Sequence, residues 1–294
     1  MRFIQVGLTL ILSLYFYYIP TVLHVEAVTI TCIVLNLTLG LVHGCNDLLL
    51  LRNYFETKKT RLWGIIVYVL IIPLLLSLYF IAPVVVSILL LGLSAYHFGE
   101  QHATNLVVAS KGVYAVLYLG LGLLIFSLLF LLNYNELAQV LSLFGFGFIT
   151  YEVLKTTVVL AVVIQLIISL SLAAAREVRL KEFLFFELEL ILLAFSFLVM
   201  DLFVGFTVYF IIWHSVPSIV KQSKILFGNN QTMTVLRYFS NAIVIYIISL
   251  TAIAAIFFYL QDSVSIAVIV PLVLLFTVPH IVTISVNYYK DVTS

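Results

Sequence analysis

Residues 62–81 read LWGIIVYVLIIPLLLSLYFI, a stretch of twenty residues without a charged side chain. A transmembrane α-helix needs about 20 mostly apolar residues to cross the hydrocarbon core of a bilayer. In lipid, the backbone N–H and C=O groups of such a segment must bond to one another, and a helix achieves this within one segment. The stretch therefore predicts a membrane-spanning helix.

The rest of the chain has the same character. Of its 294 residues, 64% are hydrophobic and only 9% are charged, whereas a soluble domain is about half apolar and a quarter charged. No hydrophilic stretch is long enough for a separate soluble domain, so we expect residues 1–294 to form a single integral membrane domain surrounded by lipid. The net charge of +1 gives no indication of a nucleic-acid partner.

Nine further apolar stretches resemble residues 62–81, so we predict an all-α, polytopic bundle of about eight to ten spans. The ten candidate spans are residues 3–23, 27–51, 62–81, 83–108, 112–133, 156–175, 182–200, 202–220, 238–260 and 264–287. The joins near Pro83 and Asp201 are tight. Residues 137–149 form either part of a connection or a re-entrant or interfacial helix.

Basic residues orient this predicted bundle, because cytoplasmic loops carry an excess of Lys and Arg. With ten spans, 13 of the 14 basic residues fall on one side of the membrane, and Lys155 alone falls on the other. We therefore predict that both termini are cytoplasmic and that the chain is a multi-pass protein of the inner (plasma) membrane of the cell.

Four of the six histidines lie within apolar spans: His43, His97, His214 and His280. Ionisable side chains inside a membrane are costly, usually face the bundle interior and indicate function. Under the ten-span arrangement all four spans run toward the cytoplasm, and a basic residue follows each histidine by 7 to 14 positions. At 1.5 Å per residue, the imidazoles lie about 11 to 21 Å from the cytoplasmic edge. Four imidazoles at comparable depth suit a metal centre in the bundle core.

Two carboxylates accompany these histidines. Asp47 follows His43 by four positions and Glu100 follows His97 by three, so on a helix each carboxylate shares a face with its histidine. We expect Asp47 to accept a hydrogen bond from a ligating histidine, on its own helix or on another, and to fix the tautomer of that histidine. Glu100 is expected either to support a ligand in this way or to be a ligand itself.

Aromatic residues precede two of the histidines. Tyr96 and Trp213 come directly before His97 and His214, where they either line a substrate cavity or face lipid and core as ordinary aromatics. His102 lies about 140° around the helix from His97, which predicts a peripheral polar role. All-histidine ligation with open positions suits iron, zinc or copper. A site at this depth is reached most easily by lipid-soluble molecules.

The candidate residues fall in four motifs whose order and spacing cover nearly the whole chain. The motifs are VHGCND at 42–47, SAYHFGE at 94–100, WHS at 213–215 and VPH at 278–280. The ordered set resembles the Brp/Blh family of bacterial and archaeal membrane proteins, the β-carotene 15,15′-dioxygenases that make retinal. The resemblance implies a carotenoid-cleaving dioxygenase that uses non-haem Fe(2+) and O₂ to split β-carotene, or a related carotenoid, into retinal.

The resemblance also implies a set of site residues. The matching motifs supply three iron ligands, His43, His97 and His214. His280 also falls on a motif and is the expected fourth ligand. Asp47 and Glu100 are the expected supporting carboxylates of the catalytic site. One position departs from the pattern of the family, which carries a second histidine one turn after the tryptophan-histidine element. Ser218 stands there, and Pro217 is expected to interrupt the helix.

A serine hydroxyl is a poor substitute for an iron-binding imidazole, so other functions stay open. Either His280 completes the site, or this chain has changed its substrate or lost its activity. The serine at 218 is consistent with a non-catalytic or altered-specificity protein that binds carotenoid or retinal. Such a protein could hand retinal to a rhodopsin. A small-solute transporter could also use intramembrane histidines, but transporters usually have broken helices and more intramembrane acids.

Overall fold

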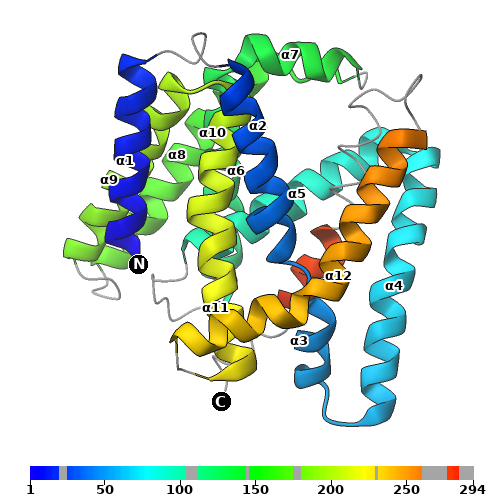
Figure 1. The fold of residues 1–294 in the computed structure, drawn as a ribbon. Coiled ribbons are helices and arrows are strands. Elements are labelled where there is room, and N and C mark those ends of the chain that lie inside the picture. The colour runs from blue at the N-terminus through cyan, green and yellow to red at the C-terminus, as the bar shows by residue number, and fades with distance from the viewer. Residues whose placement is uncertain are drawn as a thin grey trace. The chain divides into compact units, whose positions relative to one another are not determined.

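A computed structural model shows a helical chain (Figure 1) and describes residues 1–19, 25–103, 111–143, 146–174, 180–228, 231–259 and 277–284. The elements in chain order are α1 (Arg2–Tyr18), α2 (Val25–Leu35), the π-helix η2 (Asn36–Gly40), α3 (Asp47–Tyr54), α4 (Lys58–Ile81), α5 (Pro83–His102), α6 (Lys111–Leu132), α7 (Tyr134–Leu143), α8 (Tyr151–Ala174), α9 (Leu180–Val199), α10 (Leu202–Tyr209), the π-helix η3 (Phe210–Ser215), α11 (Val216–Phe227) and α12 (Gln231–Tyr259). Residues 277–284 are also helical. These ranges contain no β-strand, so the predicted all-α class is confirmed.

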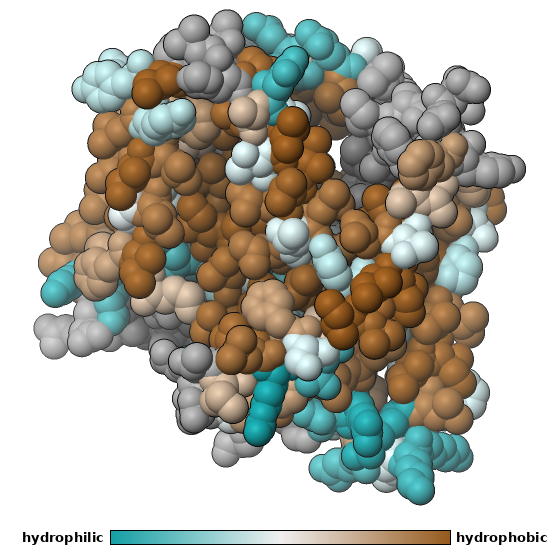
Figure 2. Space-filling view, in the orientation of Figure 1, coloured by the Kyte–Doolittle hydropathy of each residue, from teal (hydrophilic) through white to brown (hydrophobic). Residues whose placement is uncertain are grey.

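The membrane character of the helices is also confirmed. Among the described residues, six helices are long and apolar enough to cross a bilayer: Lys58–Ile81, Pro83–His102, Ala115–Leu132, Tyr151–Ala174, Leu202–Phe227 and Met233–Ala255. Apolar side chains cover most of the face drawn in Figure 2, and hydrophilic ones gather over the connection between α3 and α4. The predicted orientation of the termini stays a prediction.

Most of the expected spans coincide with helices, although the helical stretch over 202–220 continues to Phe227 and the helix over 238–260 begins at Gln231. Two further spans differ. The prediction of one continuous helix over residues 27–51 is wrong, because the chain turns at residues 43–46, between η2 and α3. The expected span 156–175 begins earlier, at Tyr151, which places Lys155 inside α8. Residues 137–149 include part of the short helix α7. Of the expected span 264–287, only residues 277–284 lie within the described part of the chain.

The chain divides into two compact units, each built from two segments. Unit 1 comprises Met1–Leu35 and Ala95–His214, and unit 2 comprises Asn36–Ser94 and Ser215–Ser294. Each of the three divisions falls within a helical stretch: one at the junction of α2 and η2, one in the middle of α5, and one just before the last residue of η3. The prediction of a single membrane domain stays a prediction, and the two units are described separately.

In unit 1, α1 carries a stripe of buried polar residues and lies along α9 (Figure 1). Gln5, Thr9 and Ser13 recur every four residues, which places them on one helical face. Ser13 lies within hydrogen-bonding distance of Ser196 on α9, with 2.6 Å between the hydroxyl oxygens. Since lipid offers no partner to such groups, the stripe holds α1 against the rest of the unit.

Helices α5 and α6 approach closely at two glycines. A Cβ atom at Gly99 would overlap the backbone carbonyl of Tyr118, and one at Gly122 would overlap the carbonyl of Ala95. Small residues at helix interfaces allow such close approach of backbones in membranes. This contact holds the C-terminal half of α5, which carries His97, directly against α6.

In unit 2, α11 packs on α12 and α3. The core of this packing is an apolar cluster whose buried members come from the η2–α3 turn, α11 and α12, namely Val42, Cys45, Ile219, Tyr238 and Ala242. A second cluster packs α4 against α5 and the 277–284 helix, with Val86, Leu90 and Val278 buried. The two clusters hold the segments that carry His43 and His280.

We predict that Gly122→Ala destabilises the protein by about 1–3 kcal/mol, because the methyl group pushes α5 and α6 apart. Gly92→Ala is the matched control on α5, since within the described structure nothing lies within 4 Å of a Cβ at Gly92. Thermal unfolding of the purified protein in one detergent measures both. Equal unfolding midpoints for the two variants would show that the contact is not tight.

Candidate metal centre

Unit 1 brings two of the predicted histidines together. The ring centroids of His97 on α5 and His214 on η3 lie 4.9 Å apart with an interplanar angle of 80°. The ring of Phe98 stacks on the ring of His214, with centroids 4.2 Å apart and an interplanar angle of 8°. This stacking covers one face of the imidazole and fixes its plane. Both imidazoles are buried, with exposed fractions of 2%.

The backbone around His214 is a π-helix, and side chains from other helices satisfy its carbonyl groups. In a π-helix the carbonyl of residue i accepts from residue i+5, so Ile212 would accept from Pro217, which has no N–H. Gln5 of α1 donates to the Ile212 carbonyl instead, at 3.0 Å. Gln101 of α5 donates to the His214 carbonyl at 2.7 Å. The helical stretch therefore continues through Pro217, where an interruption was expected.

Glu100 lies beside His97, as the i+3 spacing predicts. Its Oε2 atom is 3.7 Å from Nδ1 of His97, and both side chains are buried. This separation is longer than a hydrogen bond, so the pair is an electrostatic contact within α5. Glu100 therefore lies where a carboxylate can support His97.

Unit 2 brings the other two histidines together. The ring centroids of His43 and His280 lie 4.7 Å apart with an interplanar angle of 81°. His43 lies in the turn that follows η2, and its Nδ1 contacts the carbonyl of Gly40. Because a carbonyl only accepts, Nδ1 carries the proton and Nε2 carries the lone pair that could bind a metal.

Asp47 fixes the ring of His280. Nδ1 of His280 lies 2.9 Å from Oδ1 and 3.0 Å from Oδ2 of Asp47, and both residues are buried. The expected histidine partner of Asp47 thus comes from another segment of the chain. A carboxylate that orients an imidazole through Nδ1 is the usual support for a metal ligand that binds through Nε2.

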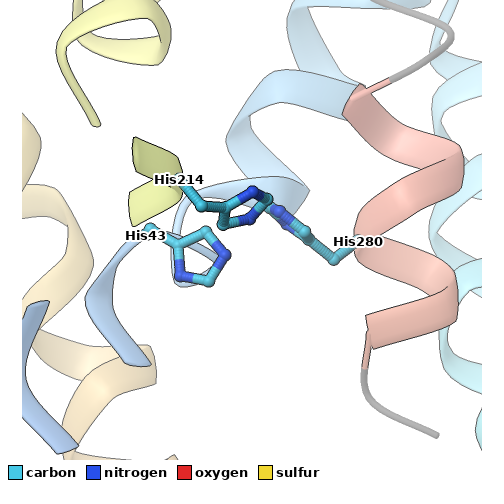
Figure 3. Close-up of side chains that lie close together, drawn as sticks. All are labelled: His43, His214 and His280. Atoms are coloured by element: carbon cyan, nitrogen blue, oxygen red, sulfur yellow. The ribbon is translucent and has the colours of Figure 1, made fainter. Parts of the chain in front are cut away.

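His214 stands at the division between the two units. It is the last residue of unit 1, and its peptide bond leads to Ser215 within the helical stretch that continues as α11. One ring nitrogen from each of His43, His214 and His280 lies within 4.8 Å of the others, and all three residues are buried (Figure 3).

The donor set fits a transition-metal ion. Two nitrogens bound to one ion at about 2.1 Å can be at most about 4.2 Å apart, so a separation of up to 4.8 Å needs only a small inward movement. Imidazole nitrogen suits iron, zinc and copper. Each imidazole offers a ring nitrogen as a ligand atom, so the arrangement can hold a divalent cation.

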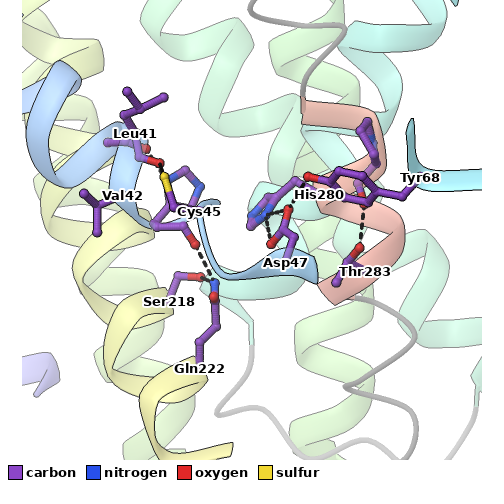
Figure 4. A network of polar contacts seen from close by, with 12 residues as sticks. Leu41, Val42, Cys45, Asp47, Tyr68, Ser218, Gln222, His280 and Thr283 are labelled. Carbon is purple, nitrogen blue, oxygen red and sulfur yellow. Dashed lines mark hydrogen bonds and ion pairs between the residues drawn. The ribbon is translucent and has the colours of Figure 1, made fainter. Parts of the chain in front are cut away.

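Ser218 belongs to a network that supports the backbone of His43. The side-chain amide of Gln222 donates to the Ser218 hydroxyl at 2.8 Å and to the His43 carbonyl at 3.0 Å (Figure 4). The hydroxyl of Tyr238 lies 2.8 Å from both the His43 carbonyl and Oε1 of Gln222. All of these side chains are buried, so the serine that replaces an expected histidine has a structural partner.

The two predicted substrate aromatics have different surroundings. Tyr96 is half-buried and packs edge-on against Tyr118 of α6, with ring centroids 5.8 Å apart. Trp213 is buried, and its Nε1 donates to Thr9 of α1 at 2.9 Å. His102, expected at the periphery, is instead buried beside Trp213 with ring centroids 5.1 Å apart. Contact of Tyr96 and Trp213 with a substrate stays a prediction.

Several supporting residues were not predicted from the sequence. Gln222 follows Ser218 by four positions, and Gln5 begins a polar stripe of period four in α1. Both patterns place polar groups on one helical face and could have indicated a buried network. Tyr68 of α4 donates a hydrogen bond to Asp47, but it is one of two tyrosines in an apolar span, where a lipid-facing tyrosine gives the same pattern.

Fold and site together define a multi-pass membrane protein with a buried cluster of histidines suited to a metal ion. Comparison with known families then identifies it: the β-carotene 15,15′-dioxygenase family matches residues 34–288, and the chain belongs to this family. The resemblance seen in the four motifs is thereby confirmed. Membership implies a dioxygenase-type enzyme with a carotenoid substrate. No curated protein and no solved structure matches the chain.

We predict that Tyr238→Phe destabilises the protein by about 1–3 kcal/mol, since it removes the only proton that the Tyr238 hydroxyl can donate to Gln222 and His43. Tyr246→Phe is the matched control on α12, because its hydroxyl forms no hydrogen bond within the described residues. Chemical or thermal unfolding in detergent compares the two. A loss of the same size in both variants would argue against the network.

Proposed function

We propose that this protein is a membrane-embedded, iron-dependent oxygenase that cleaves β-carotene, or a closely related carotenoid, with O₂ to give retinal. The observation that carries the proposal is the convergence of His43, His214 and His280 within 4.8 Å in a chain of the β-carotene 15,15′-dioxygenase family. The convergence comes from three separate segments of the chain, which a purely structural role for any one histidine does not require.

The residues that would hold Fe(2+) are the three converging histidines and His97. Because His97 contacts His214, it is the natural fourth ligand, and Glu100 beside it supplies a nearby negative charge. When bound, iron would supply the binding and activation of O₂. All-nitrogen ligation leaves coordination positions open for that purpose.

The chain's own residues prepare the site before any substrate arrives. Gly40 and Asp47 set the tautomers of His43 and His280, so that both rings present Nε2. Phe98 covers one face of His214 and keeps water from it. A ligand set whose rotamers are fixed in advance loses little entropy when the metal binds.

The substrate is expected to enter from lipid. The described spans expose large apolar side chains along their length, and a carotenoid is itself an apolar molecule of membrane dimensions. The role of the protein is then to hold one double bond of a long polyene near the metal, which is catalysis by positioning. Tyr96 and Trp213 remain the proposed aromatic contacts for the polyene.

The proposal is tested in a bacterium that accumulates β-carotene. Expression of the protein is expected to bleach the cells and produce retinal, and His43→Ala, His214→Ala and His280→Ala are each expected to abolish both. The purified wild type should contain iron, while each variant should lose at least tenfold in metal affinity. Retinal is measured by chromatography and iron by elemental analysis.

His24→Ala is the control, because His24 lies outside the predicted ligand set. Retention of bound iron and retinal formation by His43→Ala would contradict the proposal. An intact carotenoid that co-purifies with a metal-free wild type would favour a carotenoid-binding protein. A metal-free, pigment-free protein that moves solutes across vesicles would favour a transporter.

A further inference from the structure

The carboxylate of Asp47 is a buried acceptor with two donors from two different segments of unit 2. It is 1% exposed and begins α3. Besides Nδ1 of His280, the hydroxyl of Tyr68 on α4 bonds to its Oδ2 atom at 3.0 Å (Figure 4). Within the described part of the chain, no Lys or Arg forms an ion pair with Asp47.

The direction of each hydrogen bond is fixed by chemistry. An ionised carboxylate can only accept, so the hydroxyl of Tyr68 and Nδ1 of His280 are both donors. Oδ2 of Asp47 is shared by the two, at 3.0 Å from each. The position of the Tyr68 hydroxyl therefore determines how the carboxylate is rotated, and the carboxylate in turn determines the plane and tautomer of the imidazole.

Tyr68 reaches Asp47 from a helix whose side chains are at most partly buried. None of the residues in the apolar window of α4 is buried, yet Tyr68 itself is only partly exposed and points its hydroxyl toward α3. An exposed hydroxyl in a lipid-facing span would lack a partner, so the bond to Asp47 also satisfies Tyr68.

We propose that Tyr68 is a positioning residue for the metal site, whose hydroxyl holds Asp47 in the orientation that fixes His280 as a ligand through Nε2. The proposal rests on the function proposed above. Without the hydroxyl, the carboxylate loses one of its two donors and is free to rotate about its side-chain bond. The His280 ring then samples more orientations, and metal binding must restore the correct one.

The experiment compares wild type with Tyr68→Phe, Asp47→Asn and the double variant, all purified in detergent and stripped of metal. Affinities for Fe(2+) under anaerobic conditions and for Co(2+) are measured by competition with a chromophoric chelator. Tyr68→Phe is expected to weaken both affinities about tenfold, and to change the visible absorption spectrum of bound Co(2+), because supporting groups of metal ligands contribute about 10- to 100-fold.

Two comparisons show whether Tyr68 acts through Asp47. In the Asp47→Asn background, Tyr68→Phe should have almost no further effect, because the shared acceptor is already altered. Tyr79→Phe is the matched control on α4, since its hydroxyl forms no hydrogen bond within the described residues, and it should leave metal affinity unchanged.

The outcomes separate this inference from the proposed function. If the wild type binds neither ion, the metal-dependent function is overturned and the role of Tyr68 falls with it. If the wild type binds metal and Tyr68→Phe binds it equally well, only the role of Tyr68 is overturned. A lower unfolding temperature of metal-free Tyr68→Phe with an unchanged Co(2+) spectrum would likewise overturn positioning, because it would show a structural role alone.

Discussion

Backbone carbonyl groups in lipid must find hydrogen-bond donors within the protein, and this constraint governs the irregular parts of the chain. Regular helices satisfy their own carbonyls, but π-helices and turns shift the register and leave some without their usual partner. In this protein the π-helix η3 contains His214, and η2 ends shortly before His43. Polar side chains of the interior bond to the backbone at both of these places.

The same hydrogen bonds that repair the backbone also position the histidines. Gln5 and Gln101 bond to carbonyls of η3, while Gln222 bonds to the carbonyl of His43. Each is a side-chain amide, which can donate without carrying a charge into the apolar interior. As a result α1, which contains no candidate ligand, still contributes to the site by holding the backbone on which His214 lies.

The sequence predicted the spans and the four histidines because both depend on composition that lipid imposes directly. It predicted one helix over residues 27–51, since no proline marks the turn there and Gly44 and Asn46 are weak turn signals in an apolar run. It predicted a histidine partner for Asp47 on its own or another helix, but the identity of that partner depends on tertiary packing. The role of Tyr68 was not predictable, because the sequence does not show whether a tyrosine in an apolar span faces lipid or a buried carboxylate.

The role of Ser218 follows from its hydroxyl group. Gln222 lies one turn further along α11 and donates to both the Ser218 hydroxyl and the His43 carbonyl. Ser218 thus supports the backbone of one proposed ligand, His43, and does not supply a ligand itself. In the proposed site His280 supplies the imidazole that the family pattern places at 218. Asp47, which orients His280, begins α3 just after the turn that carries His43.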